Sequence, residues 1–218
     1  MTVRVKICCI SSHEEARIAI QHGASALGLV SHMPSGPGVI DEAMIQDIAG
    51  AVPPGVASFL LTSLQSVEAI VAQQKRCGAN TLQICDHLID GTYRQLRAAL
   101  PGIHIVQVIH VTGPDSLEEA KRVASQGVHA LLLDSGNQSL EVKELGGTGR
   151  THNWEISRQI VQQVDIPVFL AGGLKPANIA EALRRVRPFG VDLCSGVRTN
   201  DRLDPKKLEK FFRAIAAG

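Results

Sequence analysis

Short apolar runs alternate with amphipathic stretches eight times along the chain, and this alternation constrains the fold more than any other feature. Apolar runs bounded by turn-forming residues predict buried strands, and the stretches between them predict helices. Strands that alternate with helices form a parallel sheet. Eight such units in 218 residues predict an α/β protein with a closed (β/α)8 barrel (a TIM barrel), with a doubly wound open sheet as the rival arrangement.

The predicted elements follow one another with short connections. The predicted strands cover 3–9, 26–30, 57–62, 81–85, 104–111, 130–134, 167–171 and 191–194. The predicted helices cover 12–23, 41–52, 63–77, 92–100, 115–126, 153–164, 176–186 and 204–216. Ser12, Asp41 and Asp204 are suited to cap the helices that they begin, and Pro205 suits a first helical position. Since no linker interrupts this order, we expect one barrel domain over residues 1–218.

Composition argues against several classes of partner. Hydrophobic residues make up 44% of the chain, which is enough for a large core, and 22 basic residues nearly balance 21 acidic ones. The net charge of +1 therefore gives no reason to expect nucleic acid or a membrane surface, and one Trp with one Tyr provides no stacking platform for bases. No apolar run could cross a bilayer and no signal peptide precedes the first strand, so a cytoplasmic location is expected.

The cysteines and histidines carry no strong metal or disulfide pattern. The five cysteines are Cys8, Cys9, Cys77, Cys85 and Cys194, and their odd count without a CxxC pair argues against a disulfide framework. As small buried hydrophobic residues they would need no further role. The eight histidines form no pair at metal-binding spacing. The sequence therefore predicts no metal site.

Polar side chains end several of the predicted strands. Active sites of (β/α)8 barrels lie at the C-terminal ends of the strands, where Lys6, Cys8, His110 and Asp134 would gather. Cys8 and Asp134 come from opposite sides of the mouth. A thiol near a cation can act as a base and a buried carboxylic acid as a proton donor, so this pair is suited to proton transfer. Alternation along a strand would place Cys9 on the opposite face from Cys8.

Glycine-rich turns follow the last three predicted strands. Glycine lets backbone N–H groups approach an anion, and barrels often bind phosphate with the loops after strands seven and eight. The turns therefore predict a phosphate site, for which the candidate residues are Gly147, Thr148, Gly149, Gly172, Gly173, Ser195 and Gly196. Ordinary turns are the structural alternative.

Several motifs together resemble the phosphoribosylanthranilate isomerase family. The resemblance covers nearly the whole chain and rests on Val5-Lys6-Ile7-Cys8, Leu132-Leu133-Asp134, Gly146-Gly147-Thr148-Gly149, Leu170-Ala171-Gly172-Gly173-Leu174 with Pro176 and Asn178, residues 186–192, and Ser195-Gly196-Val197. Members of this family are cofactor-independent (β/α)8 barrels of tryptophan biosynthesis. They convert N-(5′-phosphoribosyl)anthranilate to 1-(2-carboxyphenylamino)-1-deoxyribulose 5-phosphate by an Amadori rearrangement.

The resemblance assigns roles to the strand-end residues. It implies that Asp134 protonates the ribose ring oxygen and that Cys8 removes the proton from the sugar C2. It also implies that the phosphate lies on the N–H groups around Gly147, Gly173 and Gly196. On this basis the chain is expected to be an intramolecular oxidoreductase, that is an aldose–ketose isomerase, acting on a phosphorylated sugar.

The chain departs from the family pattern in the part expected to hold anthranilate. The usual Gly after the catalytic Cys is Cys9, and the loop that normally carries an Arg reads Pro37-Gly38-Val39. The family's Gln-Leu-His-Gly is replaced by residues 83–86, and a usual Glu is Arg198. One hypothesis is that Lys6, His110 or Arg198 contacts the substrate instead. The alternatives are an isomerase of another phosphorylated (amino)sugar and a non-catalytic sugar-phosphate-binding barrel. A homodimer is one assembly that the sequence leaves open.

Overall fold

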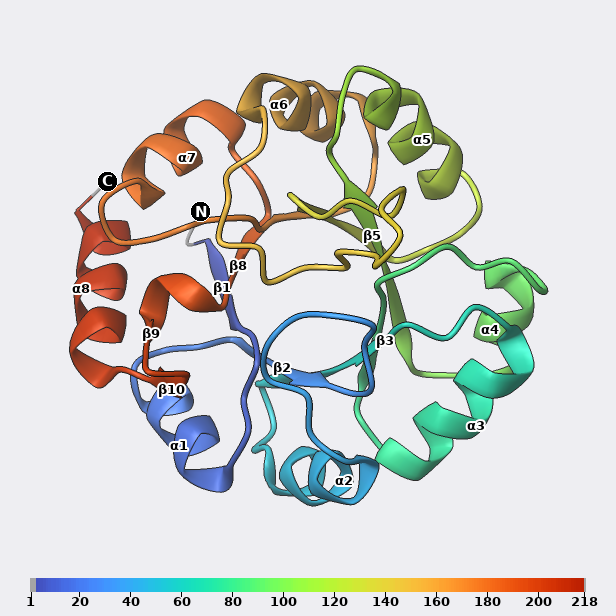
Figure 1. Ribbon diagram of the computed structural model, residues 1–218, viewed down its shortest axis with the longest axis horizontal. Coiled ribbons are helices and arrows are strands. Elements are labelled where there is room, and N and C mark those ends of the chain that lie inside the picture. Colours follow the sequence, from blue (N-terminus) through green and yellow to red (C-terminus); the bar gives the residue numbers. More distant parts are fainter. Residues whose placement is uncertain (1–2, 218) are drawn as a thin grey trace.

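The computed structural model describes residues 3–217 and is a closed barrel of eight parallel strands, as predicted (Figure 1). Residues 1, 2 and 218 of the expected domain range lie outside the described residues. The strands are β1 (Arg4–Ile7), β2 (Ala26–Val30), β3 (Ala57–Thr62), β4 (Thr81–Ile84), β5 (His104–His110), β6 (Ala130–Asp134), β7 (Val168–Leu170) and β8 (Gly190–Leu193). Parallel pairing of β1 with β8 closes the barrel.

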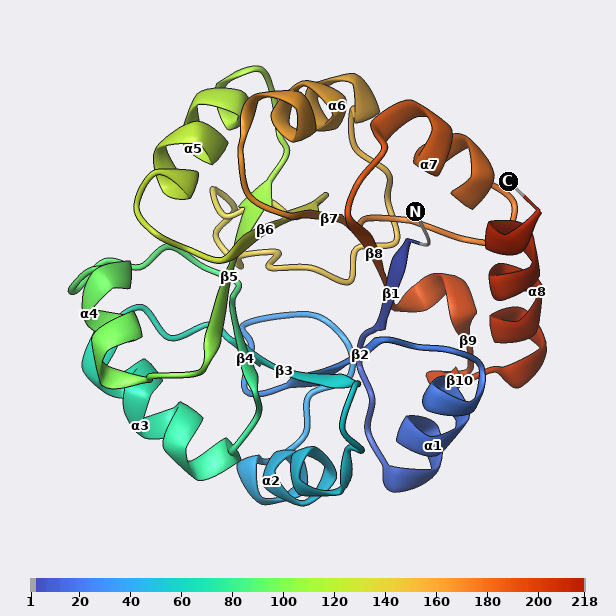
Figure 2. The same cartoon turned by 180° about the vertical axis from the view of Figure 1, so that it is seen from behind.

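Helices surround the barrel in chain order (Figures 1 and 2). They are α1 (His13–Gln21), α2 (Glu42–Ala51), α3 (Val67–Cys77), α4 (Tyr93–Ala99), α5 (Asp115–Ala124), α6 (Trp154–Gln163), α7 (Ile179–Val186) and α8 (Pro205–Ala216). None of the helices in residues 3–217 is both long and apolar enough to cross a membrane. The predicted caps are confirmed, because Ser12, Asp41 and Asp204 each accept a backbone N–H of the following turn.

The strands are shorter at the barrel mouth than the sequence predicts. β1, β4 and β8 end one or two residues early, so that Cys8 and Cys9 follow β1, Cys85 follows β4 and Cys194 follows β8. Residues past a strand end are free of the strict alternation of faces. This freedom is what lets neighbouring residues point into the same space at the mouth.

The core forms two layers. A large cluster fills the space between the sheet and the helices, and a smaller one fills the barrel interior. Phe59 and Phe169 meet edge to face within the interior, with ring centroids 6.0 Å apart. The interior is packed with side chains, so a ligand does not bind between the strands.

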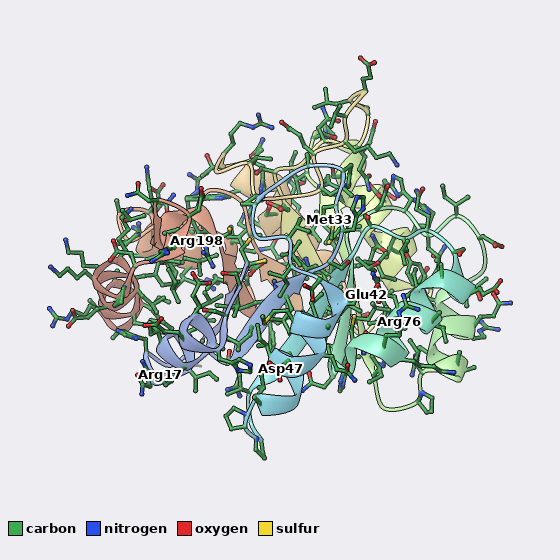
Figure 3. All side chains as sticks on the ribbon, turned by 60° about the horizontal axis from the view of Figure 1, so that its bottom comes forward. Arg17, Met33, Glu42, Asp47, Arg76 and Arg198 are labelled. Atoms are coloured by element: carbon green, nitrogen blue, oxygen red, sulfur yellow. The ribbon has the colours of Figure 1, made fainter. Side chains whose placement is uncertain are left out.

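A short segment after β8 was not predicted. It contains a 3-10 turn, η1 (Ser195–Val197), and a small antiparallel ribbon of β9 (Arg198–Thr199) and β10 (Arg202–Leu203). The buried Arg198 of this ribbon forms an ion pair with Glu15 of α1, with Nη2 and Oε2 2.8 Å apart. Figure 3 shows Arg198 well to one side of Met33, which lies in the loop over the mouth.

Candidate active site

A cavity opens at the C-terminal ends of the strands, where the sequence predicted the site. It contains about 680 Å³ of space free of atoms, open solvent at its mouth included. The loop between β2 and α2 and the long loop between β6 and α6 both contribute residues to its lining, and they pass over the barrel mouth (Figure 1). Ser35 Oγ ties these two loops together by donating a hydrogen bond to the carbonyl oxygen of Lys143, at 2.6 Å.

Cys8 and Asp134 both line this cavity. Only 7% of Cys8 and 8% of Asp134 is exposed, so their charges are poorly solvated. Burial raises the pKa of the Asp134 carboxyl, against the opposing effect of the Ser135 N–H, which donates to Oδ1 at 2.7 Å. The pKa of the Cys8 thiol is lowered by a hydrogen bond from the Cys9 side chain and by the charge of Lys6, which together outweigh burial. Asp134 is thus shifted toward its neutral, protonated form and Cys8 toward its thiolate form.

Lys6 lies under the cavity floor and is fully buried. Its Nζ is 2.8 Å from Oδ2 of Asp192 on β8 and 5.3 Å from the centroid of the Phe59 ring. Burial opposes the charge of Lys6, but Asp192 and Cys8 outweigh it, and its pKa is raised. Lys6 therefore stays cationic and stabilises negative charge on Cys8.

Asp192 lines the cavity beside Cys8 and was missed as a candidate from the sequence alone. Its Oδ1 is buried and has no hydrogen-bond partner within residues 3–217. An acidic residue inside the apolar run 190–193 is the signal that could have found it, because a carboxylate in a buried strand needs a cationic partner.

Glycine-rich turns form the rim on one side of the cavity. Gly147, Thr148, Gly149, Gly172, Gly173 and Ser195 line it, which brings six of the seven phosphate-site candidates together. Gly147 and Gly173 have φ values of 69° and 61°, which L side chains rarely adopt. Ser135 Oγ and Thr148 Oγ1 are 2.6 Å apart and join the turns to the end of β6.

Gly196, the seventh candidate, lies behind the rim. A Cβ atom there would collide with the carbonyl oxygen of Leu174. Glycine is therefore required for η1 to pack against the turn after β7, which positions Ser195 at the cavity. In this arrangement Gly196 supports the site through its packing.

His110 and Arg198 are absent from the described residues that line the cavity. His110 is buried, and its Nε2 is 2.9 Å from the carbonyl oxygen of Cys85. Arg198 donates hydrogen bonds to Glu15, to the carbonyl oxygen of Cys9 and to the carbonyl oxygen of Asp201. Burial opposes ionisation of Glu15, but Arg198 outweighs it and lowers the Glu15 pKa. The structure thus gives Arg198 a structural partner in place of a substrate carboxylate.

Cys9 also lines the cavity, so the expectation that it faces away from Cys8 is wrong. The physical reason is that β1 ends at Ile7 and Cys9 has a φ of 62°, in the left-handed region. Gly38 packs against Cys9 so closely that a Cβ atom at 38 would overlap the Cys9 side chain. The Cys at 9 and the Gly at 38 are therefore physically linked departures from the family pattern.

Cationic side chains are missing from the cavity lining within residues 3–217. An anion at the rim would therefore be held by backbone N–H groups and hydroxyls. No group of three or more His, Cys, Asp or Glu side chains in the same described range could hold a metal ion.

The fold and site define a class: a (β/α)8 barrel whose mouth holds a buried thiol and a buried carboxyl under a rim of glycine-rich turns. The family model described as N-(5′-phosphoribosyl)anthranilate (PRA) isomerase matches residues 5–214. The chain belongs to this family, and it is an isomerase.

Relatives and solved structures agree with this assignment. The chain is 36% identical over 211 residues to N-(5′-phosphoribosyl)anthranilate isomerase 2 of Methanosarcina mazei, covering 96% of this chain and 92% of that protein. It is 32% identical over 210 residues to N-(5′-phosphoribosyl)anthranilate isomerase of Methanocella arvoryzae, covering 96% and 95%. The phosphoribosyl anthranilate isomerase structure from Thermus thermophilus superposes with a TM-score of 0.80 at 26% identity, covering 99% of each chain.

Proposed function

We propose that the chain converts N-(5′-phosphoribosyl)anthranilate to 1-(2-carboxyphenylamino)-1-deoxyribulose 5-phosphate, with Cys8 and Asp134 as the proton-transfer pair. The observation that carries the proposal is that both groups line one cavity and have pKa values displaced in opposite directions. A raised carboxyl pKa favours the protonated form that can donate, and a lowered thiol pKa favours the thiolate that can accept a proton. Asp134 is the acid and Cys8 the base.

The rearrangement proceeds by proton transfers at the ring oxygen and at C2, followed by tautomerisation of the enolamine. Asp134 protonates the ribose ring oxygen, the C1–O bond breaks, and the nitrogen lone pair forms a Schiff base at C1. The Cys8 thiolate then removes the proton from C2, and the electron pair moves toward the iminium to give an enolamine. Protonation at C1 and loss of the hydroxyl proton give the ketone. Since hydrogen is redistributed within the substrate, the aldose–ketose isomerisation needs no external oxidant, reductant or cofactor.

In this proposal the phosphate binds at the rim formed by residues 146–149, 172–173 and Ser195. Backbone N–H groups in turns of left-handed glycines bind anions without a cationic side chain. The anthranilate ring then lies toward Met33 and Leu145, apolar residues that line the same cavity. Lys6 contributes through Cys8, because its ammonium group is already paired with Asp192.

A second candidate function is favoured by the loop after β2. Pro37 and Gly38 stand where the family pattern has an Arg, and the described cavity lining has no cation to replace it. Loss of a charge-assisted hydrogen bond to a carboxylate costs about 1.5–3 kcal/mol of binding free energy. The candidate is an isomerase of another phosphorylated aminosugar that has no carboxylate.

The test follows the loss of N-(5′-phosphoribosyl)anthranilate fluorescence with purified protein. We expect turnover by the unaltered chain, a loss of about 10²–10⁴-fold in Cys8→Ala and in Asp134→Asn, and no loss in Cys77→Ala. Cys77 is a matched control because it is buried in α3, outside the cavity lining. Absence of turnover by the unaltered chain would overturn the substrate, and full activity in both site variants would overturn the roles.

Two finer properties are part of the same proposal. The protein acts in the cytoplasm and assembles as a homodimer. Light scattering coupled to size exclusion tests the assembly, since a 23.3 kDa species would contradict it.

A further inference from the structure

Two cysteine thiols that the proposed chemistry leaves unused lie in contact at the cavity. The Sγ atoms of Cys9 and Cys194 are 2.7 Å apart, and both residues carry free thiols. β1 and β8 are neighbours with Ile7 opposite Leu193, and Cys9 lies two residues beyond Ile7 while Cys194 lies one beyond Leu193. Both cysteines line the cavity, where Cys9 is buried and Cys194 half-buried. A small oxidant in the cavity can therefore reach the pair.

The backbone holds Cys9 in this position from several directions. Its left-handed φ of 62° turns the side chain toward β8. Arg198 donates a hydrogen bond to its carbonyl oxygen, Gly38 packs against its Cβ, and its thiol lies 3.6 Å from the carbonyl oxygen of Pro37. Left-handed conformations of residues other than glycine are strained and persist only where the surroundings enforce them. The contact with Cys194 is thus built into the fold.

We propose that Cys9 and Cys194 form a reversible disulfide that switches off the neighbouring Cys8. The effect on turnover rests on the proposed function, whereas formation of the disulfide does not. An S–S bond is about 2.05 Å long, so the two sulfur atoms need to approach by only about 0.65 Å.

Hydrogen peroxide is the oxidant that the proposal names. The sulfur of Cys194, the more exposed thiol, attacks one peroxide oxygen, the O–O bond breaks, and Cys194 becomes a sulfenic acid with release of water. The sulfur of Cys9 then attacks the sulfenic sulfur. The S–O bond breaks, the departing hydroxide takes the Cys9 proton, and a second water leaves. Two thiols and one peroxide thus give one disulfide and two waters.

Oxidation of Cys9 affects Cys8 directly. Cys9 follows Cys8 directly in the chain and lines the same cavity, and its side chain is the largest cause of the lowered Cys8 pKa. A disulfide at Cys9 has no S–H group to donate, so Cys8 loses this stabilisation of its thiolate. Each unit by which the Cys8 pKa rises above the working pH lowers the thiolate fraction about tenfold. We therefore expect a reversible loss of turnover of about tenfold or more.

The experiment treats the native full chain with graded hydrogen peroxide and maps disulfides by mass spectrometry after tryptic digestion. Cys8 and Cys9 lie together in peptide 7–17 and Cys194 in peptide 186–198. We expect these two peptides to become linked in the unaltered chain and in Cys8→Ala. We expect no link in Cys9→Ser or in Cys194→Ser, with Cys77→Ala as a control that links normally.

Turnover is measured on the same samples. The expected result is a loss that parallels the link and is restored by dithiothreitol in the unaltered chain and Cys77→Ala. No link at any peroxide concentration that leaves the fold intact would overturn the proposal, as would a link that requires Cys8 instead of Cys9. A complete link with unchanged turnover would overturn the switch. A chain that links but never isomerises the substrate would overturn the proposed function alone.

Discussion

Replacement of Lys6 by Met should be among the most destabilising single changes in the protein. Lys6 and Asp192 form an ion pair with an N–O distance of 2.8 Å, in which Lys6 is fully buried and Asp192 is 8% exposed. Met preserves most of the side-chain volume, so the main effect is an uncompensated buried carboxylate. Removing one partner of a buried pair costs about 3–5 kcal/mol, and Oδ1 of Asp192 already lacks a partner in the described residues. We expect the free energy of unfolding to fall by this amount.

A double-variant cycle isolates the pair itself. Lys6→Met with Asp192→Asn removes both charges and should recover more than half of the loss seen in Lys6→Met. Urea unfolding at pH 7, followed by the fluorescence of Trp154, measures each variant. Trp154 is the single Trp and is buried, so its emission reports unfolding. A loss below about 1 kcal/mol in Lys6→Met, the value of a surface pair, would refute the reasoning.

The ion pair also has a pH signature. The pKa of Lys6 is raised by folding, so its contribution to stability is complete below the unfolded pKa of 10.5 and is lost as pH rises through the folded value. Destabilisation by Lys6→Met should therefore be undiminished at pH 7 and should shrink only in strong alkali.

Two further predictions concern the rim and the rate. Gly196→Ala should lower the melting temperature and weaken inorganic phosphate binding, because the new Cβ collides with the Leu174 carbonyl oxygen. Gly50→Ala in α2, with open space around it, should be neutral or stabilising by up to about 1 kcal/mol. Equal melting temperatures in the two variants would contradict the packing argument. The rate should rise with pH as Cys8 deprotonates, below the usual thiol pKa of 9.0, and fall as Asp134 deprotonates, above the usual 3.8. A pH–rate profile of kcat/KM in Lys6→Met should show the Cys8 limb moved to higher pH, and an unmoved limb would contradict the role of Lys6.

Much of the fold could be predicted from the sequence because its signals are local. The ranges of β2, β3 and β6 and the caps at Ser12, Asp41 and Asp204 follow from apolar runs and capping chemistry. The ends of β1, β4 and β8 could not, because periodicity does not show where ladder hydrogen bonds stop. Whether a cysteine at the mouth lies inside a strand or beyond its end decides the direction in which its side chain points.

The parts of the site that the sequence could not predict depend on distant residues. Arg198 was a candidate substrate contact from the sequence, but it pairs with Glu15, which lies 183 positions away in the chain. Cys9 was expected to face away because its left-handed φ has no signature in a residue other than glycine. Cys8 and Asp134, by contrast, lie at the mouth simply because they follow or end a strand, which is why sequence alone brought them together.

The central claim is that Asp134 opens the sugar ring and Cys8 removes the proton from C2. It is tested most directly by the isotope effect on kcat with substrate deuterated at the sugar C2. Cys8→Ser should slow turnover and enlarge the isotope effect, because proton removal becomes rate-limiting. Asp134→Asn should slow turnover and bring the effect toward unity, because ring opening becomes rate-limiting. The opposite pattern, or isotope effects and turnover unchanged in both variants, would contradict the account.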